Sequence, residues 1–145
     1  MSATLWLRIA AVLAGLYALG HTAGMPWTTS RDVMAQGVVV AMQGVHFAAA
    51  GSVRSYWEFY QGFGLAISVL LALEALLLWQ LASLARSTLR FRAMAWAHLV
   101  GFVCLALIAY RYLFAVPVWL AVAIAGCVGA ALAWPAVRLT ASAGQ

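Results

Sequence analysis

Residues 56–84 read YWEFYQGFGLAISVLLALEALLLWQLASL, and this stretch decides the fold. Its only charged residues are Glu58 and Glu74. A helix rises about 1.5 Å per residue, so about 20 apolar residues cross a hydrocarbon core of about 30 Å. The stretch is therefore long enough to span a membrane as one tilted helix.

Three further apolar stretches are long enough to span, at residues 5–24, 93–114 and 116–137. The chain has 145 residues, of which 67% are hydrophobic and 8% are charged. Soluble domains are about half apolar and about a quarter charged, so this composition excludes a water-soluble monomer. Because backbone polar groups in lipid must be satisfied within each segment, we expect helices. The sequence predicts a single all-α domain over residues 1–145, an integral membrane four-helix up-down bundle.

The first stretch can also be interpreted as a signal peptide. Arg8 precedes an apolar core that ends in the small residues Ala23 and Gly24, as in secretory leaders. We favour a retained helix, because its removal would leave three spans and would put the two chain ends on opposite sides.

The long connection between the first two helices covers residues 25–55. Pro26 ends the first helix, because proline cannot continue it. Ser30 is a suitable N-cap for a short helix over about residues 31–50. We expect this segment to lie on the outer face of the membrane or to fold back over the bundle.

The arginines predict the orientation of the bundle. The chain has a net charge of +5, and all eight of its basic residues are arginines. Five lie at the ends of the spans that would share one side: Arg8, Arg86, Arg90, Arg92 and Arg138. The other three are Arg31, Arg54 and Arg111. The richer side is expected to be the cytoplasm, so both termini would be cytoplasmic. The arginines form no basic cluster, which argues against nucleic-acid binding.

The main candidate ligand site lies at the outer ends of the spans. Charge within a membrane is costly, so ionisable residues there are functional candidates. The residues that could share one outer layer are His21, Arg54, Tyr56, Glu58, Gln61 and Arg111. Arg54 and Glu58 are four residues apart and would pair on one helix face. The alternative is structural, with arginines that reach toward lipid phosphates and a glutamate that neutralises one of them.

Glu74 and His98 form a second candidate site. Glu74 follows Glu58 by about 24 Å of helix, so the two carboxylates cannot act as a catalytic pair. Glu74 and His98 both belong to the cytoplasmic half and could meet across the second and third spans. Such a pair would relay protons, bind a cation or, more simply, tie two helices together.

The sequence predicts neither a metal site nor a cofactor. His21, His46 and His98 fall at different depths, which disfavours a haem held by two histidines. Cys104 and Cys127 both lie within apolar stretches and show no metal-binding spacing. We therefore expect these cysteines to behave as small apolar residues.

Three segments together resemble a known group of proteins. They are GHT at residues 20–22, RSYWEFYQGFG at residues 54–64 and RYLFAVP at residues 111–117. The set resembles a group of small bacterial proteins that have four predicted transmembrane helices and no assigned activity. The likeness covers most of the chain, and residues 54–64 are its most specific part. The resemblance implies a bacterial inner-membrane protein, and it implies no catalytic residue or ligand.

These observations predict a small binding or accessory membrane protein with a periplasmic-side polar pocket. Its ligand would be anionic or lipid-like, because arginine suits phosphates and carboxylates. Two alternatives stay open. One is a membrane-embedded enzyme that uses Glu58 and His21 as acid and base on a lipid-soluble substrate. The other is an oligomeric transporter or channel protomer with Glu74 and His98 on its path. The expected partners are membrane lipids, further copies of the chain or a larger membrane complex.

Overall fold

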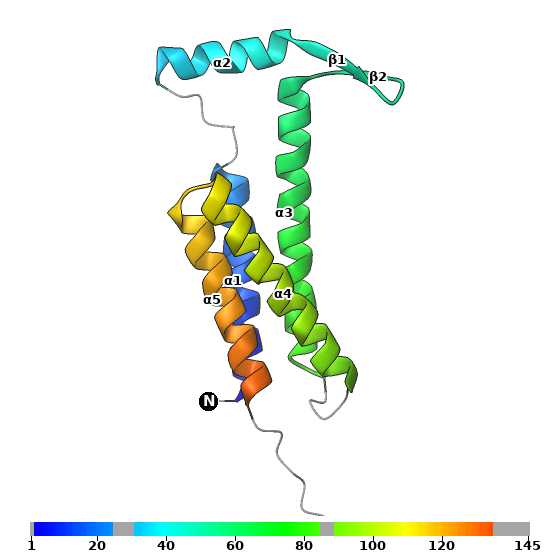
Figure 1. Cartoon of the computed structure of the whole chain (residues 1–145), viewed down its shortest axis with the longest axis vertical. Helices are drawn as coiled ribbons and strands as arrows, with labels where there is room; N and C mark the ends of the chain where they lie inside the picture. The colour runs from blue at the N-terminus through cyan, green and yellow to red at the C-terminus, as the bar shows by residue number, and fades with distance from the viewer. Residues whose placement is uncertain (1, 25–30, 85–88, 135–145) are drawn as a thin grey trace, which may run out of the picture. The chain divides into compact units, whose positions relative to one another are not determined.

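Helices dominate the computed structural model, which describes residues 2–24, 31–84 and 89–134 (Figure 1). The elements in chain order are α1 (Ala3–Gly24), α2 (Val33–Gly44), β1 (His46–Ala49), β2 (Ser52–Ser55), α3 (Tyr56–Leu81), α4 (Leu89–Tyr112) and α5 (Ala115–Ala133). The predicted helical class is therefore confirmed, with one two-stranded sheet in addition.

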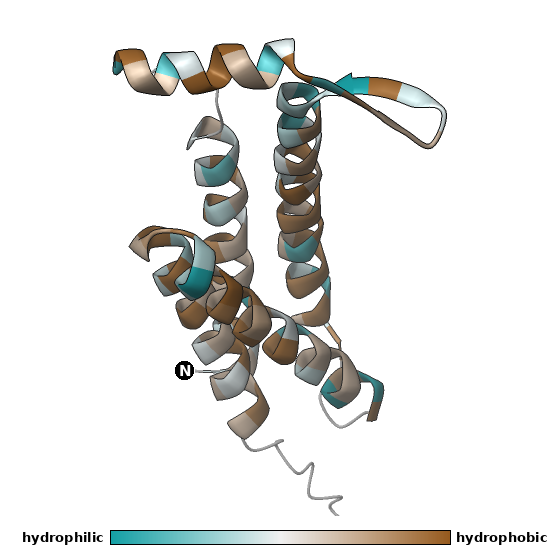
Figure 2. Ribbon diagram, turned by 45° about the horizontal axis from the view of Figure 1, so that its top comes forward, coloured by the Kyte–Doolittle hydropathy of each residue, from teal (hydrophilic) through white to brown (hydrophobic). Residues whose placement is uncertain are grey.

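Four of the helices, α1, α3, α4 and α5, are long and apolar enough to cross a membrane. Hydrophobic residues follow them along most of their length (Figure 2). These helices match the four predicted stretches, with shifted ends. Helix α3 ends at Leu81 rather than residue 84, and α4 begins at Leu89 rather than residue 93. Because α4 starts earlier than predicted, it includes Arg90 and Arg92. The prediction followed apolar residues only, whereas the helix itself begins with a polar turn.

The connection between α1 and α3 differs from its prediction. The expected helix over residues 31–50 is shorter, because α2 ends at Gly44 and the chain then forms a β-hairpin. Asp32 is the N-cap of α2, and its carboxylate accepts a hydrogen bond from the Met34 amide at 3.1 Å. The cap predicted at Ser30 lies outside the described residues.

The hairpin turns through Ala50 and Gly51. Strands β1 and β2 are antiparallel, with His46 opposite Ser55 and Ala49 opposite Ser52. Ala50 has φ 47° and Gly51 has φ 78°. Positive φ at both central residues is the feature of a type I′ turn, whose twist matches that of the two strands.

The chain divides into two compact units, each of which is described by itself. One comprises Met1–Ala14 and Glu74–Gln145, and the other comprises Gly15–Leu73. In the first unit α5 packs along α4, and a Cβ added at Gly129 would lie 4.0 Å from Leu99 Cδ1. Many of the residues buried in these two helices are small, which allows helices to approach closely: Ala95, Ala106, Ala109, Ala121, Ala125 and Ala131.

The start of α1 also belongs to the first unit. Its apolar residues Ala3, Leu7 and Ala10 are fully buried, and they recur at the three- and four-residue spacing of one helix face. The guanidinium of Arg8 lies 5.2 Å from the centre of the Trp79 ring, which places a cation over an aromatic face near the end of α3. A cation at this distance is attracted by the ring, so the contact ties these two helix ends together.

The second unit contains the rest of α1, the connection and the first part of α3. Helix α2 runs crosswise to α3 in both views (Figures 1 and 2). None of its residues is buried. The hairpin follows α2 in the chain, and β2 leads directly into the first turn of α3. This continuity fixes where the hairpin presents its side chains relative to α3.

Candidate functional site

Helix α3 begins with a capping box formed by Ser55 and Glu58. The Ser55 amide donates to Glu58 Oε2 at 2.8 Å, and the Ser55 hydroxyl donates to the same oxygen at 3.3 Å. In return the Glu58 amide donates to Ser55 Oγ at 3.1 Å. This reciprocal pattern satisfies donors that a helix start leaves without partners. The sequence signal is the spacing S-x-x-E, which our sequence interpretation of Glu58 did not use.

The hairpin positions Arg54 beside this helix start. Arg54 lies in β2, directly opposite Phe47 of β1. The Phe47 ring lies 4.9 Å from Tyr56 and 5.3 Å from Phe59, with an edge-to-face geometry in the second case. Aromatic pairs of this kind add about 0.5–1.5 kcal/mol beyond the area that they bury. Phe47 therefore anchors the strand pair to α3. Because Arg54 is paired with Phe47, this contact also sets the position of Arg54 beside the start of α3.

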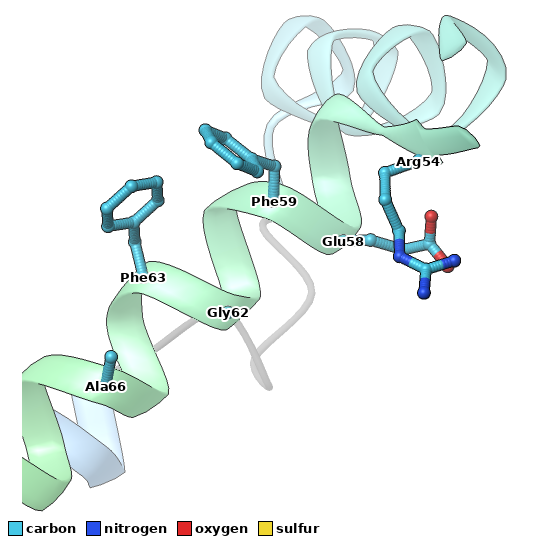
Figure 3. A pocket seen from close by; sticks show the side chains of 6 residues that line it. All are labelled: Arg54, Glu58, Phe59, Gly62, Phe63 and Ala66. Atoms are coloured by element: carbon cyan, nitrogen blue, oxygen red, sulfur yellow. The ribbon is translucent and has the colours of Figure 1, made fainter. Parts of the chain in front are cut away.

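An open hollow of about 310 Å³ lies along this part of α3. The residues that line it are Arg54, Glu58, Phe59, Gly62, Phe63 and Ala66. Figure 3 shows the charged groups of Arg54 and Glu58 close together, and the rings of Phe59 and Phe63 projecting from α3 in a different direction. The rings of Phe59 and Phe63 are 4.7 Å apart and nearly perpendicular. The hollow thus has an apolar surface, and two charged residues are among those that line it.

Gly62 also lines the hollow. A Cβ placed on Gly62 would have no atom within 4 Å, so the space above its backbone is open. Ala66, one turn further on, adds only a methyl group. Two small residues in succession along one face leave room that larger side chains would fill.

Arg54 and Glu58 do not form a salt bridge with each other. The sequence placed them four residues apart on one helix face. That expectation is wrong in detail, because α3 starts at Tyr56 and Arg54 belongs to a strand. Both residues still line the same hollow.

His21 contacts α3 at a different level. Its Nε2 donates to the carbonyl oxygen of Gly64 at 3.1 Å, and the Ser68 hydroxyl donates to the same oxygen at 3.2 Å. Gly64 lies six residues beyond Glu58, which is about 9 Å along the helix axis. No hydrogen bond joins His21 to Glu58 in the part of the chain that is described. The histidine ties α1 to α3 rather than lining the hollow.

The remaining candidates of the outer layer are distributed differently. Tyr56 is half exposed and contacts Phe47. Gln61 is half-buried and does not line the hollow. Arg111 belongs to the other unit, where its guanidinium lies 5.2 Å from the Tyr112 ring. Of the six predicted residues, the structure thus brings Arg54 and Glu58 together in one hollow.

Glu74 and His98 form a direct contact within the first unit. His98 Nδ1 lies 2.6 Å from Glu74 Oε2. The His98 side chain is 10% exposed and that of Glu74 is 39% exposed. Such a contact joins α3 to α4 through one hydrogen bond. Among the described residues, no group of three or more His, Cys, Asp or Glu side chains could hold a metal ion.

The predicted ligand-binding residues do not include the apolar lining of the hollow. Phe59 and Phe63 are four residues apart, as are Gly62 and Ala66, so each pair lies on one helix face. This spacing was visible in the sequence. Its meaning depends on the rotation of α3 relative to the hairpin, which spacing alone does not provide.

Comparison with protein-family models, curated proteins and solved structures finds no match to this chain.

Proposed function

We propose that this chain is a multi-pass membrane protein that binds one amphipathic molecule in the hollow on α3. The acidic headgroup of that molecule would contact Arg54, and its apolar chain would lie on Phe59, Gly62 and Phe63. The single observation that carries the proposal is the composition of the hollow, whose lining combines an apolar surface with two charged residues. An amphipathic ligand has the same two parts.

The dimensions of the hollow support this class of ligand. Its volume of about 310 Å³ is at the lower end of the range for ligand sites, which is about 300–1,000 Å³. From Glu58 to Ala66 the helix rises about 12 Å, roughly the thickness of one hydrocarbon leaflet. A headgroup and the first part of one acyl chain fit this space, whereas a whole two-chain lipid does not.

The proposed setting is a bacterial inner membrane with an up-down arrangement of the four spans. The two-residue link between α4 and α5 and the packing of these helices support antiparallel neighbours. The arginine distribution supports cytoplasmic termini, and the resemblance described above supports a bacterial origin. In this orientation α2, the hairpin and the charged residues of the hollow lie at the periplasmic surface. There, Arg54 would meet lipid headgroups.

The geometry gives less support to acid–base catalysis by Glu58 and His21. A general acid or base must reach the same reacting atoms, yet Glu58 caps α3 while His21 contacts Gly64. The contact between Glu74 and His98 is compatible with a role in proton or cation transfer. A single pair does not make a path, so we favour binding.

Lipid retention by the purified full chain tests the proposal. Native mass spectrometry from mild detergent would compare the wild type with Gly62→Leu, using added phosphatidylethanolamine and phosphatidylglycerol. The leucine side chain meets open space, so it fills the hollow and leaves the helix intact. Loss of the acyl-chain contact should lower the bound fraction about tenfold, because two buried CH₂ groups contribute about that factor.

The matched control is Gly101→Leu. Gly101 also lies within an apolar helix and also has open space at its Cβ position, but it is remote in sequence from the hollow. This variant should retain lipid as the wild type does. Equal retention by the wild type and Gly62→Leu would contradict the proposed function.

A further inference from the structure

The residues that line the hollow include two of opposite charge, Arg54 and Glu58. A purely anionic headgroup would be attracted by Arg54 and repelled by Glu58. A purely cationic headgroup would meet the reverse pair of effects. Because the two side chains lie close together beside the hollow (Figure 3), a headgroup that carries both signs of charge would suit both of them.

The hydrogen bonds leave each charged group able to bind a ligand. Arg54 donates from Nη1 to the Val53 carbonyl at 3.2 Å, and a guanidinium has five N–H donors. Glu58 accepts both bonds from Ser55 at Oε2. Oε1 accepts no hydrogen bond from any described residue. One oxygen therefore fixes the carboxylate, and the other stays available.

The capping box makes the Glu58 carboxylate a fixed acceptor rather than a freely rotating one. A carboxylate held by a backbone amide at 2.8 Å loses little further freedom when a ligand binds, which favours affinity. The N–H groups of a primary ammonium can donate to a free carboxylate oxygen. A quaternary ammonium has no N–H and cannot.

We infer that the ligand is a zwitterionic aminophospholipid, with its phosphate on Arg54 and its primary ammonium on Glu58 Oε1. The two charges of such a headgroup are separated by a two-carbon linker, so they match two oppositely charged side chains that lie close together beside a hollow. This inference rests on the proposed function, since it names the ligand of the same site. It adds that the site discriminates between lipids by the cationic part of the headgroup.

A competition between three lipids with identical acyl chains tests the inference. The purified full chain would be offered phosphatidylethanolamine, phosphatidylcholine and phosphatidylglycerol in equal amounts, and native mass spectrometry would measure the bound ratios. The wild type should hold phosphatidylethanolamine at least about tenfold over each competitor, the factor typical of one charge-assisted hydrogen bond.

Glu58→Gln is the decisive variant. Glutamine also forms a capping box with serine, so α3 keeps its start while the negative charge is lost. The ratio of phosphatidylethanolamine to phosphatidylglycerol should then fall to about one. Asp32→Asn is the matched control, because asparagine caps α2 as well as aspartate does and Asp32 does not line the hollow. This control should keep the wild-type ratio.

The outcomes separate the inference from the proposed function. An unchanged ratio in Glu58→Gln, or a wild type that shows no preference, overturns the inference. If Gly62→Leu still lowers the retention of all three lipids in that case, the proposed function stands and only the headgroup assignment fails. If Gly62→Leu retains every lipid as the wild type does, both fail.

Discussion

His98 Nδ1 lies 2.6 Å from Glu74 Oε2, so α3 and α4 share a polar contact between two otherwise apolar helices. A fully buried ion pair can cost 3–5 kcal/mol when one partner is removed, whereas polar contacts between membrane helices average about 0.6 kcal/mol. Glu74 is 39% exposed, which favours the smaller value. The pair therefore acts as a moderate tie between the helices.

The stability losses from removing the two partners of this pair, singly and together, should not be additive. Glu74→Leu and His98→Leu should each lower the free energy of unfolding by about 1 kcal/mol, because each leaves a polar group without its partner. The double variant should lose less than the sum, since two leucines pack against each other. Denaturant unfolding in micelles, followed by circular dichroism, measures the three values. Additive losses would show that the contact contributes no coupling energy.

The capping box predicts a local effect at the start of α3. Ser55→Ala removes the side-chain acceptor for the Glu58 amide, and such caps are typically worth about 1 kcal/mol. Hydrogen exchange of the first-turn amides of α3 should accelerate about fivefold at that cost. Ser52→Ala is the control, because Ser52 is an exposed serine in the same strand. Equal exchange in both variants would contradict a capping role for Ser55.

The four long apolar helices could be predicted because apolar length depends on local composition alone. Their ends could be predicted less well. Apolar residues mark the part of a helix that suits lipid, whereas the backbone continues through polar turns, as it does at Arg90 and Arg92 in α4. The early start of α4 follows from this difference, whereas the end of α3 at Leu81 does not.

The hairpin was missed because its strands are short and their residues are also compatible with helix. Ala48, Ala49 and Ala50 have high helix propensity, so composition extended the predicted helix through them. The contrary signal was Gly51 between Phe47 and Val53, which is typical of a two-residue turn between strands. The tertiary contact of Phe47 with α3 decides between the two, and no local pattern contains it.

Of the residues that line the hollow, the charged Arg54 and Glu58 were among the predicted ligand-binding residues, and the apolar ones were not. Charge in an apolar sequence is conspicuous, so Arg54 and Glu58 could be found from composition. The partner of His21 could not, because helix rise gives the depth of a side chain and not the direction in which it points. Every residue has a backbone carbonyl, so the sequence does not show that the carbonyl of Gly64 is the one that accepts this hydrogen bond.

The Ala50–Gly51 turn predicts that two substitutions act in opposite directions. Ala50 has φ 47°, a left-handed conformation that costs an ordinary residue about 1 kcal/mol. Asparagine tolerates it and is preferred before glycine in type I′ turns, so Ala50→Asn should increase the exchange protection of the strand amides. Gly51→Ala should decrease it, because Gly51 has φ 78°. A loss of protection in Ala50→Asn would contradict the turn type.

The packing of α5 against α4 predicts different tolerance at two glycines of one helix. A Cβ at Gly129 would lie 4.0 Å from Leu99 Cδ1, whereas a Cβ at Gly126 would have no atom within 4 Å. Gly129→Ala makes only an ordinary contact and should be neutral or stabilising, by up to about 1 kcal/mol of helix propensity.

Gly129→Leu should instead push the two helices apart and cost about 1–3 kcal/mol, as overpacking does in protein cores. Gly126→Leu has the same added volume on the same helix and should unfold close to the wild type. Thermal unfolding in micelles distinguishes the two leucine variants by their midpoints. Equal destabilisation of the two leucine variants would contradict this prediction. It would show that another surface, such as a second copy of the chain, covers Gly126.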